Sequence, residues 1–164
     1  MAVLPILTGD HAMLRQKAKR VGKVDRAVQR LLDDMTETMH AAPGIGLAGN
    51  QIGQLLRVIV LDVEDSAFQL VNPEIARSEG SVVVEEGCLS LPGYYGDVRR
   101  PERVTVRALN RNGKPLKIHA DGMLARALQH EIDHLNGVLF TDRLASLSDL
   151  RYVSPSEEAE ELKV

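Results

Sequence analysis

The apolar residues in the first quarter of the chain follow a helical spacing. From Val24 to Met39 they recur at steps of three and four residues, which places them on one face of an α-helix. Pro43 and Gly44 follow this stretch, and neither favours continuation of a helix. The pattern therefore predicts an N-terminal amphipathic helix with one face packed against a core.

The middle of the chain is rich in strand-forming residues. The continuous β-branched run Leu56–Val63 predicts a buried strand. Phe68–Val71 predicts a second strand, which we expect to stop at Asn72 and Pro73. Val82–Val84 predicts a third, short strand.

A hairpin and a second helix are predicted next. Val104–Leu109 alternates apolar and polar residues and leads into the turn Asn110–Gly113, whose Asn-Gly pair we expect to adopt positive φ angles. Lys114–Ala120 is the expected returning strand. Asp121 then occupies an N-cap position and Gly137 a C-cap position. The apolar residues between them lie at helical spacing, namely Leu124, Leu128, Ile132 and Leu135.

The order of these elements predicts the fold class. Near the end of the chain, Ser154–Glu157 has the form of a capping box and predicts a short C-terminal helix. Helices on both sides of a strand-rich middle indicate an α+β fold, with mixed or antiparallel strands packed around the second helix. The 164 residues fit a single catalytic domain spanning residues 1–164, because domains average about 150 residues.

Composition and charge narrow the classes of partner. The 20 Lys and Arg against 23 Asp and Glu give a formal net charge of −3, which argues against direct nucleic-acid recognition. The single cysteine, Cys88, rules out an internal disulfide and fits a reducing compartment. Met1–Gly9 lacks the features of a signal peptide, and no apolar run reaches the ~18 residues that cross a bilayer. We therefore expect a cytoplasmic protein without membrane contacts.

The strongest chemical signal is an H-E-x-x-H pattern in the second predicted helix. His130 and His134 are four residues apart, so both imidazoles lie on one helix face and can bind one metal ion. Glu131 lies to one side, where it can act on a water molecule without ligating the metal. The alternative is a helix whose histidines only make core or surface contacts.

A catalytic metal site of this kind usually needs a third protein ligand. Zinc peptidases of one common type place a histidine six residues after the second one, but Phe140 occupies that position here. Cys88 is the favoured donor, because glycine and turn residues around it allow the backbone to approach a metal. Taken alone, a single cysteine is as often a small buried hydrophobe.

A glycine-rich segment, Gly44–Gly53, lies between the first helix and the first strand. It does not have the sequence of a phosphate-binding loop. It is either a flexible connector or a loop whose backbone pairs with an extended ligand, with the Gln51 amide directed at a reacting carbonyl.

Three segments together resemble the signature motifs of the peptide deformylases, in order and at similar spacing. They are Gly44–Gln51 (GIGLAGNQ), Glu86–Ser90 (EGCLS) and Gln129–His134 (QHEIDH). Leu4–Leu7 and the turn at 112–115 also match the family's habit, so the likeness covers essentially the whole chain. One departure is Gly49, where the family usually has alanine, and it bears on the stiffness of the loop.

The resemblance implies an enzyme that removes the formyl group from the N-terminal formylmethionine of new polypeptides and releases formate. By similarity, Cys88, His130 and His134 hold one divalent metal ion. Glu131 acts as general base and then general acid. The Gln51 side chain and the Leu89 backbone N–H stabilise the oxyanion.

The resemblance also implies a substrate site. The backbone of Ile45 and Gly46 would pair with the peptide as an added strand. The methionine side chain would enter an apolar pocket lined by Ile45, Met123 and Ala127. Arg126 falls on the same stretch, and we assign it no role.

Glu86 and Arg100 are predicted to form an ion pair that either steadies the Cys88 segment or lies on the solvated surface. The ligand set does not identify the metal. The resemblance implies iron(II) in the cell, and zinc, nickel or cobalt also suit such a ligand set in purified protein. Expected partners are N-formylmethionyl nascent peptides and the ribosome near its exit tunnel, for a monomer in a bacterial cytoplasm.

Three other functions are also compatible with the sequence. A general zinc endopeptidase shares the H-E-x-x-H pattern but needs a different third ligand. A non-catalytic relative would keep the fold and lose the reaction. A thiol redox sensor built on Cys88 would need glutathione or a second chain, because there is no second cysteine.

Overall fold

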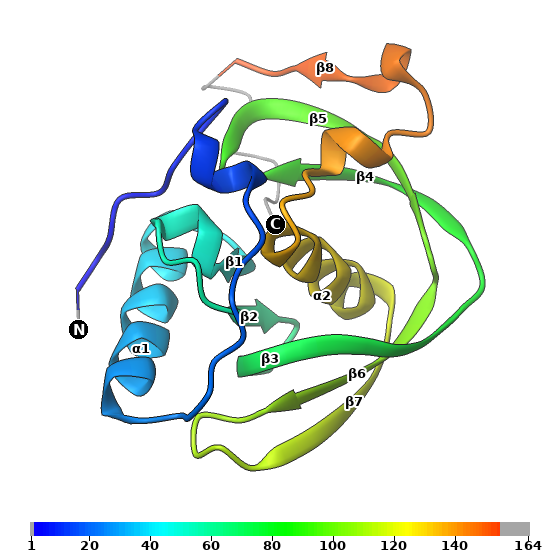
Figure 1. Ribbon diagram of the computed structural model, residues 1–164. Coiled ribbons are helices and arrows are strands. Elements are labelled where there is room, and N and C mark those ends of the chain that lie inside the picture. Colours follow the sequence, from blue (N-terminus) through cyan, green and yellow to red (C-terminus); the bar gives the residue numbers. More distant parts are fainter. Residues whose placement is uncertain (1, 155–164) are drawn as a thin grey trace.

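Two antiparallel sheets and two α-helices make up the computed structural model, which describes residues 2–154 (Figure 1). The five-stranded sheet has the order β1-β2-β3-β6-β7 and the three-stranded sheet the order β4-β5-β8. The predicted α+β class is confirmed. The C-terminal helix predicted at Ser154–Glu157 falls almost entirely outside the described residues.

The elements have the following bounds. The larger sheet contains β1 (Gly46–Ala48), β2 (Val58–Val63), β3 (Ser66–Glu79), β6 (Arg103–Leu109) and β7 (Pro115–Asp121). The smaller sheet contains β4 (Val82–Cys88), β5 (Leu91–Arg100) and β8 (Arg151–Tyr152). The helices are α1 (Arg26–Ala41), α2 (Gly122–Leu135) and four 3₁₀ turns, η1 (Ala12–Arg15), η2 (Gly49–Ile52), η3 (Phe140–Arg143) and η4 (Leu147–Asp149).

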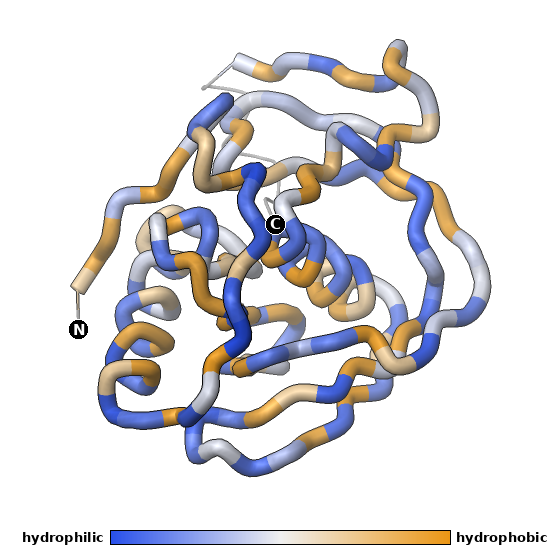
Figure 2. Tube along the Cα trace, viewed as in Figure 1, coloured by the Kyte–Doolittle hydropathy of each residue, from blue (hydrophilic) through white to orange (hydrophobic). Residues whose placement is uncertain are grey.

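The two α-helices pack on opposite faces of the larger sheet, and β2 lies between them. Val58 and Val60 share a hydrophobic cluster with α1, whereas Ile59 and Leu61 share another with α2. A strand buried on both faces has no polar alternation, which explains the continuous apolar run of β2. Both helices alternate hydrophobic and hydrophilic residues in Figure 2, as expected for helices with one buried face.

The ends of both helices differ slightly from the prediction. Helix α1 begins at Arg26 rather than Val24, because the Asp25 side chain caps it by accepting a hydrogen bond from the Val28 N–H at 3.0 Å. Asp121 precedes α2 as predicted, but its side chain makes no capping hydrogen bond. Gly137 lies one residue beyond the C-cap, with φ +74°.

The termination of α2 has a defined hydrogen-bond pattern. The Gly137 N–H donates to the His134 carbonyl at 3.0 Å, and the Val138 N–H donates to the Asp133 carbonyl at 2.9 Å. This is a Schellman motif, which requires a left-handed residue that glycine supplies. It ends the helix directly after the H-E-x-x-H pattern.

One turn was not predicted, and the predicted Asn110–Gly113 turn differs in its backbone conformation. The two-residue turn between β2 and β3 has Glu64 and Asp65 at φ 46° and 69°, the signs of a type I′ turn. In the predicted Asn-Gly turn only Gly113 has a positive φ, +78°. There the Asn110 side chain accepts from the N–H groups of Asn112 and Lys114, which stabilises a longer loop.

Strand β3 does not stop at Asn72 and Pro73, as the sequence predicted, but continues to Glu79. Asn72 has φ 51°, and the register with β6 shifts between Val71 and Glu74, so a bulge accommodates the proline. The sequence also gave no indication of β5, whose proline and two glycines are unusual in a strand.

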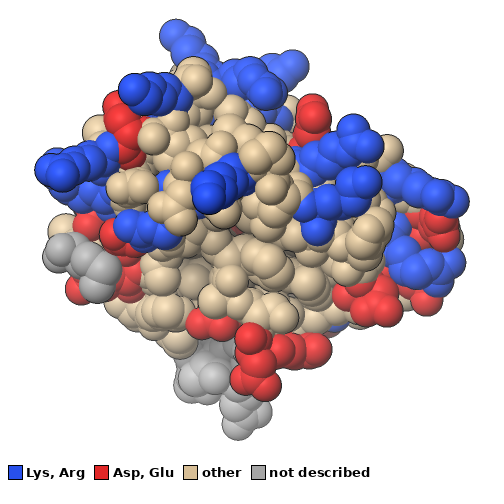
Figure 3. Space-filling model, turned by 90° about the horizontal axis from the view of Figure 1, so that it is seen from below, with Lys and Arg blue, Asp and Glu red and all other residues tan. Residues whose placement is uncertain are grey.

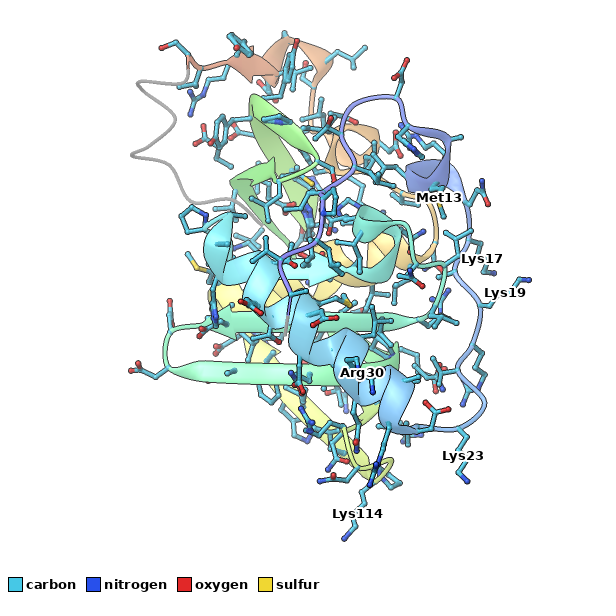
Figure 4. All side chains as sticks on the ribbon, turned by 90° about the vertical axis from the view of Figure 1, so that its left-hand side faces the viewer. Met13, Lys17, Lys19, Lys23, Arg30 and Lys114 are labelled. Atoms are coloured by element: carbon cyan, nitrogen blue, oxygen red, sulfur yellow. The ribbon has the colours of Figure 1, made fainter. Side chains whose placement is uncertain are left out.

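Charged side chains are distributed unevenly over the surface. Figure 4 shows Lys17, Lys19 and Lys23 along one edge of the molecule, with Arg30 and Lys114 nearby. Both signs of charge surround a largely uncharged centre on the face in Figure 3.

None of the helices within residues 2–154 combines the length and apolar character needed to cross a bilayer.

Asn72 generates a stability prediction. Its side chain accepts from the Val21 N–H and donates to the Val21 carbonyl, both at 2.8 Å. Asn72→Ala should lower the free energy of unfolding by about 2–4 kcal/mol, because it removes two buried hydrogen bonds and leaves Cβ at a positive φ. Asn72→Gly should cost about 1 kcal/mol less, because glycine tolerates that φ. Urea denaturation measures both, and equal losses would contradict the contribution of backbone strain.

Candidate metal centre

Three donor atoms from two distant parts of the chain meet in the interior. Cys88 lies at the end of β4, and His130 and His134 lie one turn apart on α2. The Cys88 Sγ is 3.3 Å from His134 Nε2, which is 3.1 Å from His130 Nε2. All three ligand atoms lie within 4.8 Å of one another, and all three residues are buried.

The spacing of these atoms fits a tetrahedral metal ion. Bonds of about 2.0–2.3 Å to nitrogen and sulfur place neighbouring ligand atoms roughly 3.3–3.8 Å apart in a tetrahedron. The two imidazoles also turn the same kind of nitrogen, Nε2, toward one another and toward the sulfur. Nitrogen lone pairs that face each other in a buried site repel unless a proton or a metal cation lies between them. The residues present therefore fit a metal ion.

His130 is oriented by a carboxylate. Its Nδ1 lies 2.9 Å from Glu86 Oε1, so Nε2 is directed at the cluster, the arrangement usual for metal-binding histidines. Burial would raise the pKa of Glu86, but hydrogen bonds from His130 and Arg100 outweigh it and lower the pKa to about 2. Burial and the proximity of His130 hold the pKa of His134 well below its usual value.

The predicted ion pair between Glu86 and Arg100 is buried and does not lie on the surface. Arg100 Nε lies 2.5 Å from Glu86 Oε2, and both side chains are at most 3% exposed. Because Glu86 also contacts His130, the pair links β4 and β5 to α2. The sequence left open whether this ion pair lies beside the Cys88 segment or on the solvated surface. In the structure it is buried beside the Cys88 segment.

Glu131 follows His130 on α2, and its carboxylate lies against β1. A Cβ added at Gly46 would lie 2.4 Å from Glu131 Oε2, so the strand backbone approaches the carboxylate closely. Neither carboxylate oxygen accepts a hydrogen bond from any other described residue. Burial is the main reason that the pKa of Glu131 is raised to about 7.

Gln51 is held at the same site by η2. Its Oε1 accepts from the Ala48 N–H at 2.9 Å, which fixes the orientation of the amide. The Nε2 atom then donates to Ser90 Oγ at 3.1 Å and lies 3.7 Å from the Cys88 sulfur. Sequence reasoning missed Ser90, although it lies in the same short motif as Cys88.

The glycine-rich segment is tightly packed. A Cβ at Gly49 would lie 2.6 Å from the carbonyl oxygens of Gln54 and Leu56, and a Cβ at Gly44 would lie 2.6 Å from Leu89 Cδ1. Of the two hypotheses for this segment, a flexible connector is therefore the poorer one. At Gly49 an alanine would require the backbone to move.

The remaining predicted residues fall in two places. Leu89 is buried in the cluster around α1, and Ile45 and Met123 pack against the cluster that contains Ala127. Arg126 is half-buried, and within residues 2–154 no hydrogen bond or ion pair is recorded for it.

Phe140 packs against the candidate metal ligands but offers no ligand atom itself. Its ring stacks on His130, with 6.3 Å between ring centroids and 22° between planes. It also shares a small hydrophobic cluster with Cys88. The three other histidines lie apart from the site: His11 caps η1, His40 contacts Asp62 and His119 contacts Thr105.

An α+β fold that brings a cysteine and two H-E-x-x-H histidines together beside a buried glutamate defines a mononuclear metallohydrolase. Comparison with known proteins identifies the family of metallohydrolases to which the chain belongs. Residues 3–149 match the family described as polypeptide deformylase. The chain belongs to this family and is a deformylase.

Relatives agree over most of the chain. The peptide deformylase of Symbiobacterium thermophilum is 52% identical, with 98% of this chain and 74% of that protein covered. That of Alkaliphilus metalliredigens is 54% identical, with 88% and 98% covered.

Solved structures agree as well. The Legionella pneumophila peptide deformylase superposes with a TM-score of 0.86 at 48% identity, covering 90% of this chain and 89% of that one. The Ehrlichia chaffeensis enzyme in complex with actinonin gives 0.87 at 41% identity, covering 91% and 92%.

Gly46 provides a test of the packing around Glu131. Gly46→Ala should lower the free energy of unfolding by about 1–3 kcal/mol, because the added methyl overlaps the buried carboxylate. Gly22→Ala is the control, since a Cβ there meets nothing within 4 Å, and it should leave stability unchanged or slightly raised. Equal effects of the two substitutions in urea denaturation would contradict the close contact.

Proposed function

We propose that the chain hydrolyses the formamide bond of N-formylmethionyl peptides at the Cys88–His130–His134 cluster, with Glu131 as the proton-transferring residue. One observation carries this assignment: a buried carboxylate with no other hydrogen-bond partner among the described residues lies beside three converging metal ligands. A divalent metal ion bound there supplies a Lewis acid that lowers the pKa of a coordinated water molecule.

Glu131 transfers a proton in two steps of the reaction. Its carboxylate accepts a proton from the attacking water molecule and later donates a proton to the departing amine, so that the amine leaves in neutral form. Glu131 adjoins His130 in the sequence, and its carboxylate lies against β1, where it would reach the reacting atoms without occupying a ligand position.

Gln51 and Leu89 stabilise the negative charge that develops on the formyl oxygen. The Gln51 amide is fixed by Ala48 with Nε2 near the sulfur, and the Leu89 N–H belongs to the residue that follows Cys88. Donors that are already oriented cost no reorganisation during the reaction, and each is worth about 3 kcal/mol in comparable sites.

The substrate peptide pairs with the backbone of Ile45 and Gly46. In support, β1 is the edge strand of its sheet and pairs within the described chain only with β2; an edge strand can accept a further strand. The methionine side chain enters the apolar surroundings of Ile45, Met123 and Ala127, which pack in or against one cluster.

A zinc endopeptidase is the main alternative, and Phe140 speaks against it. Its ring stacks on His130, and a phenyl ring offers no ligand atom. A non-catalytic relative and a thiol redox sensor also fit less well, because Glu131, Gln51 and all three ligands are retained together.

The biological setting is part of the proposal. The substrates are the N-termini of newly made polypeptides, which the enzyme meets in a bacterial cytoplasm near the ribosome exit tunnel and as a monomer. The organisms of the relatives named above support the bacterial part of this proposal.

The central test separates metal binding from catalysis. Glu131→Gln should retain the metal but release formate from formyl-Met-Ala-Ser at least about 100-fold more slowly, because it cannot accept a proton. Cys88→Ala should lose both metal and activity, because two imidazoles alone bind weakly. Metal analysis and a formate assay on wild type and both variants measure this.

A second substrate distinguishes formate release from cleavage of the peptide chain. An internally labelled peptide should remain intact while formate is released. Cleavage of that peptide by wild type, or full activity of Glu131→Gln, would overturn the assignment.

The metal identity gives a second prediction. We propose iron(II) as the metal in the cell, and an anaerobic iron(II)-loaded sample should release formate faster than the zinc form. Air should inactivate the iron form, because thiolate-bound iron(II) is oxidisable, and leave the zinc form unchanged. Equal rates for the two metals would show the iron preference to be wrong.

A further inference from the structure

A chain of ion pairs leads from the metal-ligand cluster to the surface. Its first buried member beyond Glu86 is Arg100, whose side chain is 3% exposed. Arg100 donates from Nε and Nη2 to Glu86, at 2.5 and 3.0 Å, and from Nη1 to Asp133 Oδ2 at 2.9 Å. One guanidinium thus serves two carboxylates.

Asp133 has a second partner, Arg143 of η3. Arg143 Nε lies 2.5 Å from Asp133 Oδ2, and Nη2 lies 2.9 Å from Oδ1. This two-pronged contact is the strongest geometry available to an arginine and a carboxylate. The Arg143 side chain is 46% exposed, whereas the Asp133 side chain is 12% exposed, so the chain of contacts ends at the surface.

Charge balance shows what Arg143 adds. Glu86 and Asp133 carry two negative charges, and Arg100 carries one positive charge. Arg143 makes the group neutral. An uncompensated charge in a buried cluster is costly, so without Arg143 the two carboxylates compete for the single guanidinium of Arg100.

That competition reaches a metal ligand. Glu86 Oε1 accepts from both Arg100 Nη2 and His130 Nδ1, so a shift of Arg100 toward Asp133 moves the carboxylate that orients His130. Asp133 also adjoins His134 in the sequence and lies in the last turn of α2. His134 is therefore the sequence neighbour of Asp133, and His130 is reached from Asp133 in three contacts, through Arg100 and Glu86.

We propose that Arg143 is a positioning residue for the metal centre. By neutralising Asp133 it leaves Arg100 engaged with Glu86, and Glu86 then holds His130 with Nε2 directed at the metal. This inference rests on the proposed metal-binding function of Cys88, His130 and His134. It adds Arg143, which lies outside all three sequence motifs, to the residues on which that function depends.

A matched control, Arg15 of η1, contacts the same 3₁₀ turn η3. Arg15 contacts Asp142 Oδ2 at 2.5 Å, and its side chain is 50% exposed, close to the value for Arg143. This pair also anchors η3, but no contact between Arg15 and Asp133 is recorded among the described residues. Arg15→Gln therefore weakens the attachment of the turn without changing the charge contacts of Asp133.

The experiment compares Arg143→Gln, Arg143→Lys and Arg15→Gln with wild type. Each zinc-loaded protein is mixed with a chromophoric chelator, and the rate of zinc release is followed in the absence of substrate. Arg143→Gln should release zinc roughly 3–10 times faster, since residues that orient ligands directly commonly affect metal affinity by about 10–100-fold, and Arg143 acts on His130 only through Asp133, Arg100 and Glu86. Arg143→Lys should be intermediate, and Arg15→Gln should match wild type.

Steady-state kinetics and urea denaturation complete the test. We expect Arg143→Gln to lower kcat on formyl-Met-Ala-Ser with KM unchanged. The visible spectrum of its cobalt(II) form should shift, and that of Arg15→Gln should not. The proposal is overturned if zinc release is unchanged in Arg143→Gln. It is also overturned if Arg143→Gln and Arg15→Gln both release zinc faster, each in proportion to its loss of stability in urea. Absence of bound metal in wild type would instead refute the proposed function.

Discussion

The meeting of one sulfur and two imidazole nitrogens in the interior is the constraint on which the other features depend. Cys88 and His134 are 46 residues apart in sequence, so the end of β4 must cross α2 at a fixed place. The buried Glu86–Arg100 pair holds that crossing. Polar groups of this kind are costly to bury unless each has a partner, which explains why the surrounding contacts are so specific.

The glycines show how the same requirement acts on the backbone. Gly46 brings β1 against the Glu131 carboxylate, and Gly44 brings the preceding loop against Leu89. A strand edge, the Glu131 carboxylate and the residue that follows Cys88 can then pack closely together. The scaffold supplies rigidity here, because packed elements and not mobile loops set these distances.

The sequence predicted the local features well and the long-range ones poorly. Helical periodicity located α1 and α2, and the apolar run located β2, because these patterns arise from burial on one or two faces. The path of β3 through Pro73 was missed, since the Asn72 contacts with Val21 come from a distant segment. For the same reason Arg143 drew no attention: its role depends on a carboxylate that only folding brings near.

The N-terminal segment connects the chemistry to the edge of the molecule. The Leu7 N–H donates to the Gln51 carbonyl and the Gly9 N–H to the Ser90 carbonyl, so this strap joins two of the three motif segments. Chain ends fray at lower cost than packed helices open. Warming that detaches residues 7–9 would therefore loosen the Gln51 and Ser90 segments while α2 stays folded, so we expect activity to be lost at a lower temperature than the helices melt.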